Sequence, residues 1–166
     1  MTEIERIHDV QKAFFQSGKT LDYAFRKEML QRFDHALHTY EKALTDALWT
    51  DLHKSYEEAY LTEISIVYGE IRNHLRHLCC WMRPERKSSP ISIFPARSKV
   101  ITEPLGNTLI IAPWNYPVQL MLNPLVGAIS AGCTAMLKPS PYTPYVSAVL
   151  SEMIRATFSE EYIGIV

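Results

Sequence analysis

The segment 107-NTLIIAPWNYPVQLMLNPLVGAISAGCTAMLKPSPYTP-144 decides the fold class of this chain. It begins with a short β-branched run, 108-TLIIA-112, which Pro113 ends, as is typical of a buried strand. Residues 118–131 then have the pattern of a helix, and 134-TAMLK-138 has the pattern of a second buried strand. The segment therefore predicts a strand–helix–strand unit.

The residues that follow extend this unit by one more helix and strand. Thr143 and Pro144 predict the N-cap and first residue of a helix that runs to about Phe158. The apolar run 162-YIGIV-166 then begins a third short strand. Two successive βαβ crossovers require a parallel sheet covered by helices.

The first half of the chain has a different pattern, because residues 3–82 are predicted to be helical almost throughout. Gly18 is a natural end for the first helix, and Thr20 can cap a second helix that runs to about Leu44. A third helix is predicted from about Tyr56 to Met82. The apolar stripe of the second helix comprises Leu21, Phe25, Met29, Phe33, Leu37, Tyr40 and Leu44. Such stripes indicate core packing.

Between the halves, 83-RPERKSSPISIFPARS-98 has the composition of a surface connector. We therefore divide the chain into a helical segment (1–82), the connector (83–98) and the first part of an α/β domain (99–166), in which 99–104 is also a strand candidate. The predicted fold class is α/β, with N-terminal helices followed by the first βαβαβ part of a parallel doubly wound sheet. Three strands are only half of the usual arrangement.

Composition excludes several classes of function. The 166 residues carry 17 basic and 18 acidic side chains, a net charge of -1, so no basic excess indicates nucleic acid binding. The N-terminus lacks the apolar core of a signal peptide. The longest apolar stretch, 118–137, is interrupted by Asn123, Pro124 and Gly132, which argues against a membrane segment. We expect a soluble, cytoplasmic protein.

The three cysteines, Cys79, Cys80 and Cys133, make no disulfide framework. Cys79 and Cys80 fall within the third predicted helix, where we expect packing thiols rather than a redox pair. His74 and His77 share a helix face, but no thiol or carboxylate cluster completes a ligand set, so we expect no metal site.

Functional groups in a parallel α/β sheet gather outside the carboxyl ends of the strands. This rule places Pro113–Tyr116 beside Lys138–Ser140. The two segments offer one neutral donor, Asn115, and one cation, Lys138, and no glycine-rich phosphate loop is present. From the residues alone, Asn115 could equally be a turn-forming residue that caps the following helix.

The stretches 110-IIAPWNYP-117 and 123-NPLVGAISAGCTAMLKPS-140 closely resemble the aldehyde dehydrogenase superfamily, in which one strand leads into a Pro-Trp-Asn-Phe/Tyr-Pro turn and the next ends in Lys-Pro-Ser. Upstream segments such as FFQSGKT, DLHKS, EAYLTEI, WMRPER and EPLGN look like the class 3 branch. The resemblance covers essentially the whole chain. It implies an incomplete aldehyde dehydrogenase fold and the oxidation of an aldehyde to a carboxylic acid with NAD or NADP.

In that family a cysteine thiolate attacks the aldehyde, and the resulting thiohemiacetal loses hydride to become a thioester that water hydrolyses. The resemblance implies that Asn115 stabilises the oxyanion during this step. The family's nucleophile and general base fall beyond Val166, so we expect this chain alone to be inactive and to be the N-terminal part of a larger enzyme. Cys133 stands where the family commonly has Asn, and we expect it to be structural.

The resemblance also assigns the neighbouring residues. The implied cofactor-binding residues are Ala112, Pro113, Trp114, Lys138 and Ser140, and the implied substrate-channel residues are Tyr116 and Leu120. Lys138 resembles the lysine that contacts the adenosine ribose. The family usually has a glutamate in Lys-Pro-Ser-Glu, where this chain has Pro141. A carboxylate there binds ribose hydroxyls and repels a 2′-phosphate, so its absence predicts that NADP binds as well as NAD.

Two alternatives remain open at this point. The chain could be a truncated, non-catalytic homologue that acts by association or regulation. If the resemblance is set aside, the pattern also fits an α/β nucleotide-binding module with a helical adaptor. A protein whose natural mass is near the 19.1 kDa of this chain would favour the truncated homologue. If the enzyme is complete, the resemblance implies a homo-oligomer, such as a dimer, that takes an aldehyde substrate.

Overall fold

The computed structural model describes residues 2–166, and its helices follow the predicted order. The α-helices are α1 (Glu3–Gln16), α2 (Tyr23–Leu52), α3 (Tyr56–Ala59), α4 (Ser65–Trp81), α5 (Gln119–Ala131) and α6 (Pro144–Thr157). Short 3₁₀ turns lie at η1 (Lys19–Leu21) and η3 (Ile91–Ile93), and a π-helical turn, η2 (Tyr60–Ile64), joins α3 to α4.

The predicted βαβαβ unit is confirmed. The strands β3 (Asn107–Ile111), β4 (Thr134–Lys138) and β5 (Ile163–Ile165) form a parallel sheet in the order β3-β4-β5, with α5 and α6 as the two crossovers. The register pairs Ile111 with Lys138, so β3 and β4 end at the same edge.

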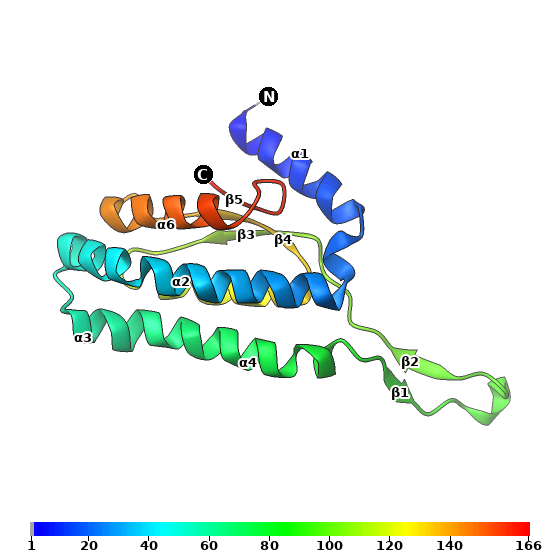
Figure 1. The fold of residues 1–166 in the computed structure, drawn as a ribbon. Helices are drawn as coiled ribbons and strands as arrows, with labels where there is room; N and C mark the ends of the chain where they lie inside the picture. The colour runs from blue at the N-terminus through cyan, green and yellow to red at the C-terminus, as the bar shows by residue number, and fades with distance from the viewer. Residues whose placement is uncertain (1) are drawn as a thin grey trace.

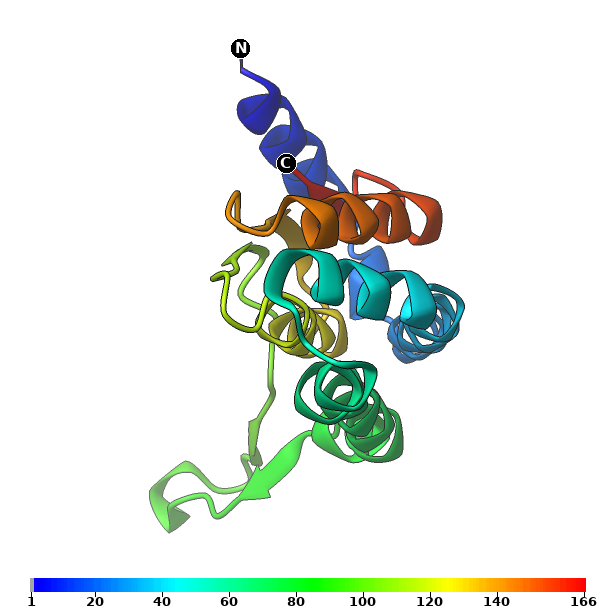
Figure 2. The same ribbon diagram turned by 90° about the vertical axis from the view of Figure 1, so that its left-hand side faces the viewer.

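The helices cover the sheet in layers (Figures 1 and 2). Helix α1 crosses one face, while α5 and α6 cover the other face; α2 and α4 lie side by side outside them. The core lies between α2, α4, α5, α6 and the sheet, and its fully buried side chains include Phe33, Leu48, Ile71, Leu122 and Leu150. On the second predicted helix, the apolar stripe is buried or partly buried except for Leu21.

Of the three predicted helix caps, two lie at the predicted residues and one is wrong. Gly18 ends the first helix with a positive φ, as predicted. Helix α2, however, is capped by Asp22, whose carboxylate accepts from the Phe25 amide, and not by Thr20. Thr143 and Pro144 are the N-cap and first residue of α6, as predicted, but the Thr143 side chain makes no capping hydrogen bond. Asp51 of α2 accepts from the Val146 amide at 2.8 Å instead.

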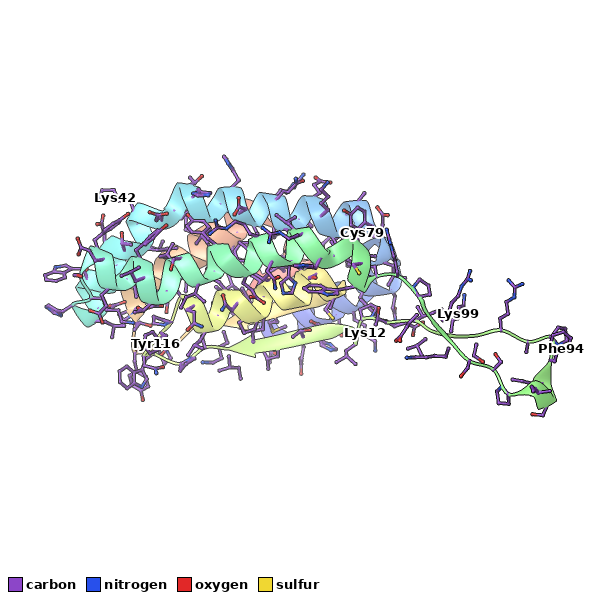
Figure 3. All side chains as sticks on the ribbon, turned by 90° about the horizontal axis from the view of Figure 1, so that it is seen from below. Lys12, Lys42, Cys79, Phe94, Lys99 and Tyr116 are labelled. Atoms are coloured by element: carbon purple, nitrogen blue, oxygen red, sulfur yellow. The ribbon has the colours of Figure 1, made fainter. Side chains whose placement is uncertain are left out.

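The connector forms part of a β-hairpin that the sequence analysis did not predict. Strands β1 (Glu85–Lys87) and β2 (Ser98–Val100) pair antiparallel, so the start of the strand candidate at 99–104 belongs to a separate hairpin. This hairpin projects from the helical body and exposes Phe94 at its tip (Figures 1 and 3). Its apolar side chains stay exposed, with Ile91 at 94% and Phe94 at 86%.

Strand β3 is buried on only one face, although the sequence predicted a buried strand. Ile110 is buried against the α5 side, whereas Leu109 and Ile111 are 59% and 62% exposed on the opposite face. The difference arises because β3 is an edge strand in residues 2–166 and α1 contacts only part of that face.

Of the cysteines, Cys133 is buried as predicted, at the turn between α5 and β4. Cys79 and Cys80 are exposed, so the expectation that they are packing thiols is wrong. No helix in the described part of the chain is both long and apolar enough to cross a bilayer.

Arg26 joins the start of α2 to the end of α5. This buried guanidinium donates to the carbonyls of Thr20 (2.7 Å) and Ser130 (3.2 Å), and burial lowers its pKa. It lies directly over Gly132, whose φ is +86° and whose missing Cβ would come within 2.5 Å of the guanidinium. Glycine is thus required at this helix end both for its backbone conformation and for space.

An ion pair holds α1 to the loop before β5 and makes part of the stability dependent on pH. Arg6 contacts both carboxylate oxygens of Glu160 at 2.6 and 3.0 Å. The hydrogen bond from Arg6 lowers the pKa of Glu160, so the pair stabilises the fold above the unfolded pKa and is lost as pH falls through the folded pKa. We expect Glu160→Gln to lower Tm at neutral pH, with the deficit closing below about pH 4. Thermal melts of both proteins across pH check this, and a constant deficit would contradict it.

Candidate active site

The two segments predicted to carry function lie side by side at the carboxyl edge of the sheet. The Ala112 amide donates to the Lys138 carbonyl at 3.0 Å, which continues the β3–β4 ladder by one bond. The turn Pro113–Pro117 therefore leaves the sheet beside the Lys138–Ser140 turn, and the predicted adjacency is confirmed. Figure 3 places Tyr116 at the opposite end of the molecule from Phe94 of the hairpin.

Asn115 is exposed in this turn, and its backbone and side chain have different environments. Its carbonyl oxygen accepts a hydrogen bond from Lys54 Nζ at 2.9 Å. Its side-chain amide forms no hydrogen bond with any group in residues 2–166. The amide is thus presented to the outside from a fixed backbone.

Asn115 does not cap the following helix. The first amides of α5, those of Val118 and Gln119, donate instead to Glu63 Oε2 at 2.8 and 3.2 Å. A carboxylate at this position also suits the partial positive charge of a helix N-terminus. The capping function that the sequence left open for Asn115 is therefore performed by another residue.

Glu63 belongs to a buried ion pair that the sequence analysis missed. Its side chain is fully buried, and its Oε1 accepts from Lys54 Nζ at 2.6 Å. The same ammonium lies 4.0 Å from the ring centroid of Tyr116, within the range of a cation–π contact. The turn is thus held by two charges from the helical segment, although its own sequence contains none.

Local structure explains how these two charges reach the turn. Lys54 follows His53, the C-cap of α2, which has a positive φ of 54° and reverses the chain. Glu63 lies in the π-helical turn η2. The extra residue of such a turn changes the direction of the side chains that follow it, and these turns are frequent at functional sites.

A signal for this pair was present in the sequence. Glu63 lies four residues from both Ala59 and Val67, on the apolar stripe of a predicted helix, and both neighbours are buried. A charged residue on a core-facing stripe requires a partner. Nothing local identifies Lys54 as that partner, because the π-helical turn and the reversal at His53 are not visible in the helical periodicity.

The other predicted site residues surround the turn. Trp114, Tyr116 and Leu120 are partly exposed, at 55%, 38% and 36%. Lys138 is exposed at the end of β4, and among residues 2–166 it has no ion-pair partner. Ser140 is different, because it is buried and its hydroxyl accepts from the Tyr142 amide at 3.3 Å. Its hydroxyl thus already shapes the turn that leads into α6.

No cluster of three or more histidine, cysteine, aspartate or glutamate side chains that could hold a metal ion occurs in the described part of the chain. The side chains of this edge offer an exposed amide at Asn115, an exposed ammonium at Lys138 and aromatic surface at Trp114 and Tyr116.

The parallel sheet, its covering helices and the groups gathered at its carboxyl edge define an α/β protein of the doubly wound class. The model of the aldehyde dehydrogenase family matches residues 2–165, and the chain belongs to this family. Its relatives include several members of family 3, which confirms the class 3 resemblance.

Two curated relatives show how much of the family the chain represents. It is 43% identical over 166 residues to the 4,4'-diaponeurosporen-aldehyde dehydrogenase of Staphylococcus aureus, covering all of this chain and 36% of that protein. It is 41% identical over 140 residues to human aldehyde dehydrogenase family 3 member B1, covering 84% of this chain and 30% of that protein. The chain thus spans about a third of the length of these relatives and matches their N-terminal portion.

Solved structures agree with the fold. A substrate-bound structure of Staphylococcus aureus AldH superposes with a TM-score of 0.98 at 43% identity, over 100% of this chain and 36% of that one. A betaine aldehyde dehydrogenase of the same organism, in complex with NAD+, gives a TM-score of 0.83 at 25% identity, over 99% and 32%.

Proposed function

We propose that the protein acts as an NAD(P)-dependent aldehyde dehydrogenase, and that Asn115 donates a hydrogen bond to the oxyanion formed from the aldehyde. The observation that carries this proposal is the side-chain amide of Asn115, which is exposed and unpartnered among residues 2–166 while its backbone is held by Lys54. An amide that neither shapes its turn nor caps its helix is available for an external acceptor.

An oxyanion requires a donor that is fixed before the charge develops. When a thiolate adds to an aldehyde carbonyl, the carbonyl oxygen takes the negative charge, and an amide N–H can stabilise it without losing a proton. The Asn115 amide satisfies this requirement. The thiolate, and the general base for thioester hydrolysis, belong to the remaining two thirds of the family's length.

The residues of this edge also fit a nicotinamide dinucleotide. Lys138 offers an ammonium that no carboxylate in residues 2–166 neutralises, suited to ribose hydroxyls. Trp114 exposes an aromatic surface, and Ala112 and Pro113 bring backbone close to the sheet edge. We assign these four residues to cofactor binding, together with Ser140, whose hydroxyl contributes through the shape of its turn. When bound, the nicotinamide accepts the hydride.

Tyr116 and Leu120 are assigned to the wall of the aldehyde channel, because they follow Asn115 on the exposed side of the turn and the first turn of α5.

The proposal is tested by aldehyde-dependent reduction of NAD or NADP. The enzyme that contains this chain together with the rest of the family's length should produce the reduced cofactor and a carboxylic acid. The 166-residue chain alone should produce neither. Absence of turnover by the complete enzyme with short, long and aromatic aldehydes would overturn the proposal.

Cofactor preference depends on Pro141, which is exposed where the family usually has a glutamate. We expect Pro141→Glu to shift the ratio of kcat/KM for NAD over NADP toward NAD, because a carboxylate repels the 2′-phosphate and binds ribose hydroxyls. Pro141→Gln is the matched control, since it has the same length without the charge. An unchanged ratio in Pro141→Glu would contradict this explanation.

A further inference from the structure

We propose that Lys54 and Glu63 are positioning residues for Asn115, so that a buried ion pair in the helical segment sets the direction of the catalytic amide. This inference rests on the proposed function, because it assigns a partner to the amide on which that function depends.

The pair holds the turn on both sides of the functional residue. Lys54 Nζ donates to the Asn115 carbonyl at 2.9 Å, and Glu63 Oε2 accepts from the Val118 and Gln119 amides at 2.8 and 3.2 Å. Because Lys54 and Glu63 are themselves joined at 2.6 Å, the two anchor points are fixed relative to each other. The backbone from Asn115 to Val118 is thereby held at both ends.

A fixed backbone leaves few ways for the amide to point. With its own carbonyl held, Asn115 can reorient its amide only through the two side-chain torsions. Catalytic groups must be held to within about 0.5 Å and 10–20° of their productive geometry, by supports that are themselves locked. The support here is rigid, because Lys54 is only 8% exposed and Glu63 is fully buried.

The arrangement also explains why the support is an ion pair. Three of the contacts that shape the turn are to backbone groups. One of these groups is a carbonyl, which needs a donor, and two are amides, which need an acceptor. A single cationic or a single anionic side chain could not satisfy all three. An ammonium and a carboxylate in contact supply both. Their opposite charges cancel locally, so the developing oxyanion is met by a neutral amide.

Lys54 acts through Asn115 and does not contact substrate itself. Its buried ammonium is directed at Glu63 Oε1, the Asn115 carbonyl and the face of the Tyr116 ring. These contacts occupy the ammonium on the inner side of the turn, whereas the Asn115 amide is exposed.

A double-mutant cycle in the complete enzyme tests this role. We expect Lys54→Met to lower kcat by roughly tenfold to a hundredfold, since a displacement of about 1 Å can cost 10²-fold. In an Asn115→Ala background, the same substitution should change kcat by less than about twofold, because there is no amide left to position. A loss that is equal in both backgrounds would overturn the inference.

Glu63→Gln provides a second variant in case Lys54→Met folds poorly. It keeps the length of the side chain and one oxygen acceptor but removes the charge that holds Lys54. We expect a smaller loss of kcat that likewise disappears in the Asn115→Ala background. If neither of the two single variants, Glu63→Gln and Lys54→Met, changes kcat, the inference is overturned.

Arg26→Met is the matched control. Arg26 is a buried cation that donates to two backbone carbonyls, as Lys54 donates to one, but its contacts are at the other end of α5. We expect it to lower Tm and leave kcat unchanged; a comparable fall in kcat would show that lost stability alone explains the Lys54 result.

If Asn115→Ala itself leaves kcat unchanged, the assignment of Asn115 in the proposed function fails, whatever Lys54 does.

Discussion

Replacing Asn115 with alanine is expected to lower the kcat of the complete enzyme by about 10²–10³, equivalent to about 2.7–4 kcal/mol of transition-state stabilisation. The physical reason is that a preorganised donor is lost where negative charge develops. KM for the aldehyde should change little, because the uncharged ground-state carbonyl is a weaker acceptor than the oxyanion. Steady-state kinetics with a single aldehyde and saturating cofactor measure both quantities.

Two controls sharpen this result. Asn73→Ala removes the same amide from an exposed position on α4 and should leave kcat unchanged. Asn115→Asp keeps the size of the side chain but places an ionised acceptor at the oxyanion, so its kcat should fall at least as far as that of Asn115→Ala. An effect of Asn115→Ala on KM alone would show that the amide binds substrate without stabilising the oxyanion.

The second large effect is on stability. Breaking a buried ion pair by removing one partner costs about 3–5 kcal/mol, because the remaining charge is left buried and unpaired. We therefore expect Lys54→Met or Glu63→Leu to lower the free energy of unfolding of this chain by an amount in that range. Urea unfolding, followed by circular dichroism, measures it.

The double variant Lys54→Met/Glu63→Leu distinguishes the cost of an unpaired buried charge from the cost of the lost backbone hydrogen bonds. It leaves no buried charge, so it should be more stable than Glu63→Leu alone, although the Val118 amide still lacks its acceptor. Lys42→Met, which breaks the exposed Lys42–Asp46 pair, is the comparison and should change stability by less than about 1 kcal/mol. A Lys54→Met effect as small as that of Lys42→Met would show that the buried pair does not stabilise the fold.

Much of the fold could be predicted because its signals are local. Short β-branched runs ended by proline, and helices ended by Gly18 and Gly132, fix the order of elements, and parallel crossovers then bring the ends of β3 and β4 together. The turn around Asn115 was located correctly for the same reason. The position of Lys138–Ser140 beside this turn follows from the parallel topology and not from the composition of these residues.

What could not be predicted depends on contacts between residues distant in sequence. Glu63 is 55 residues before the Val118 amide that it accepts from, and Asp51 is 95 residues before Val146. Sequence reasoning assigned the cap of α6 to the nearest threonine and left open a cap of α5 by Asn115, because only local candidates were visible. Tertiary packing supplies the caps from elsewhere, Glu63 of η2 for α5 and Asp51 of α2 for α6.

The end of α2 therefore determines more than its own packing. Asp51 accepts from the Val146 amide at the start of α6. Lys54 holds the Asn115 carbonyl and pairs with Glu63, which accepts from the Val118 amide at the start of α5. The segment 51-DLHK-54 thus links the starts of two helices that are far apart in sequence, and a single substitution in it can disturb both sides of the carboxyl edge at once.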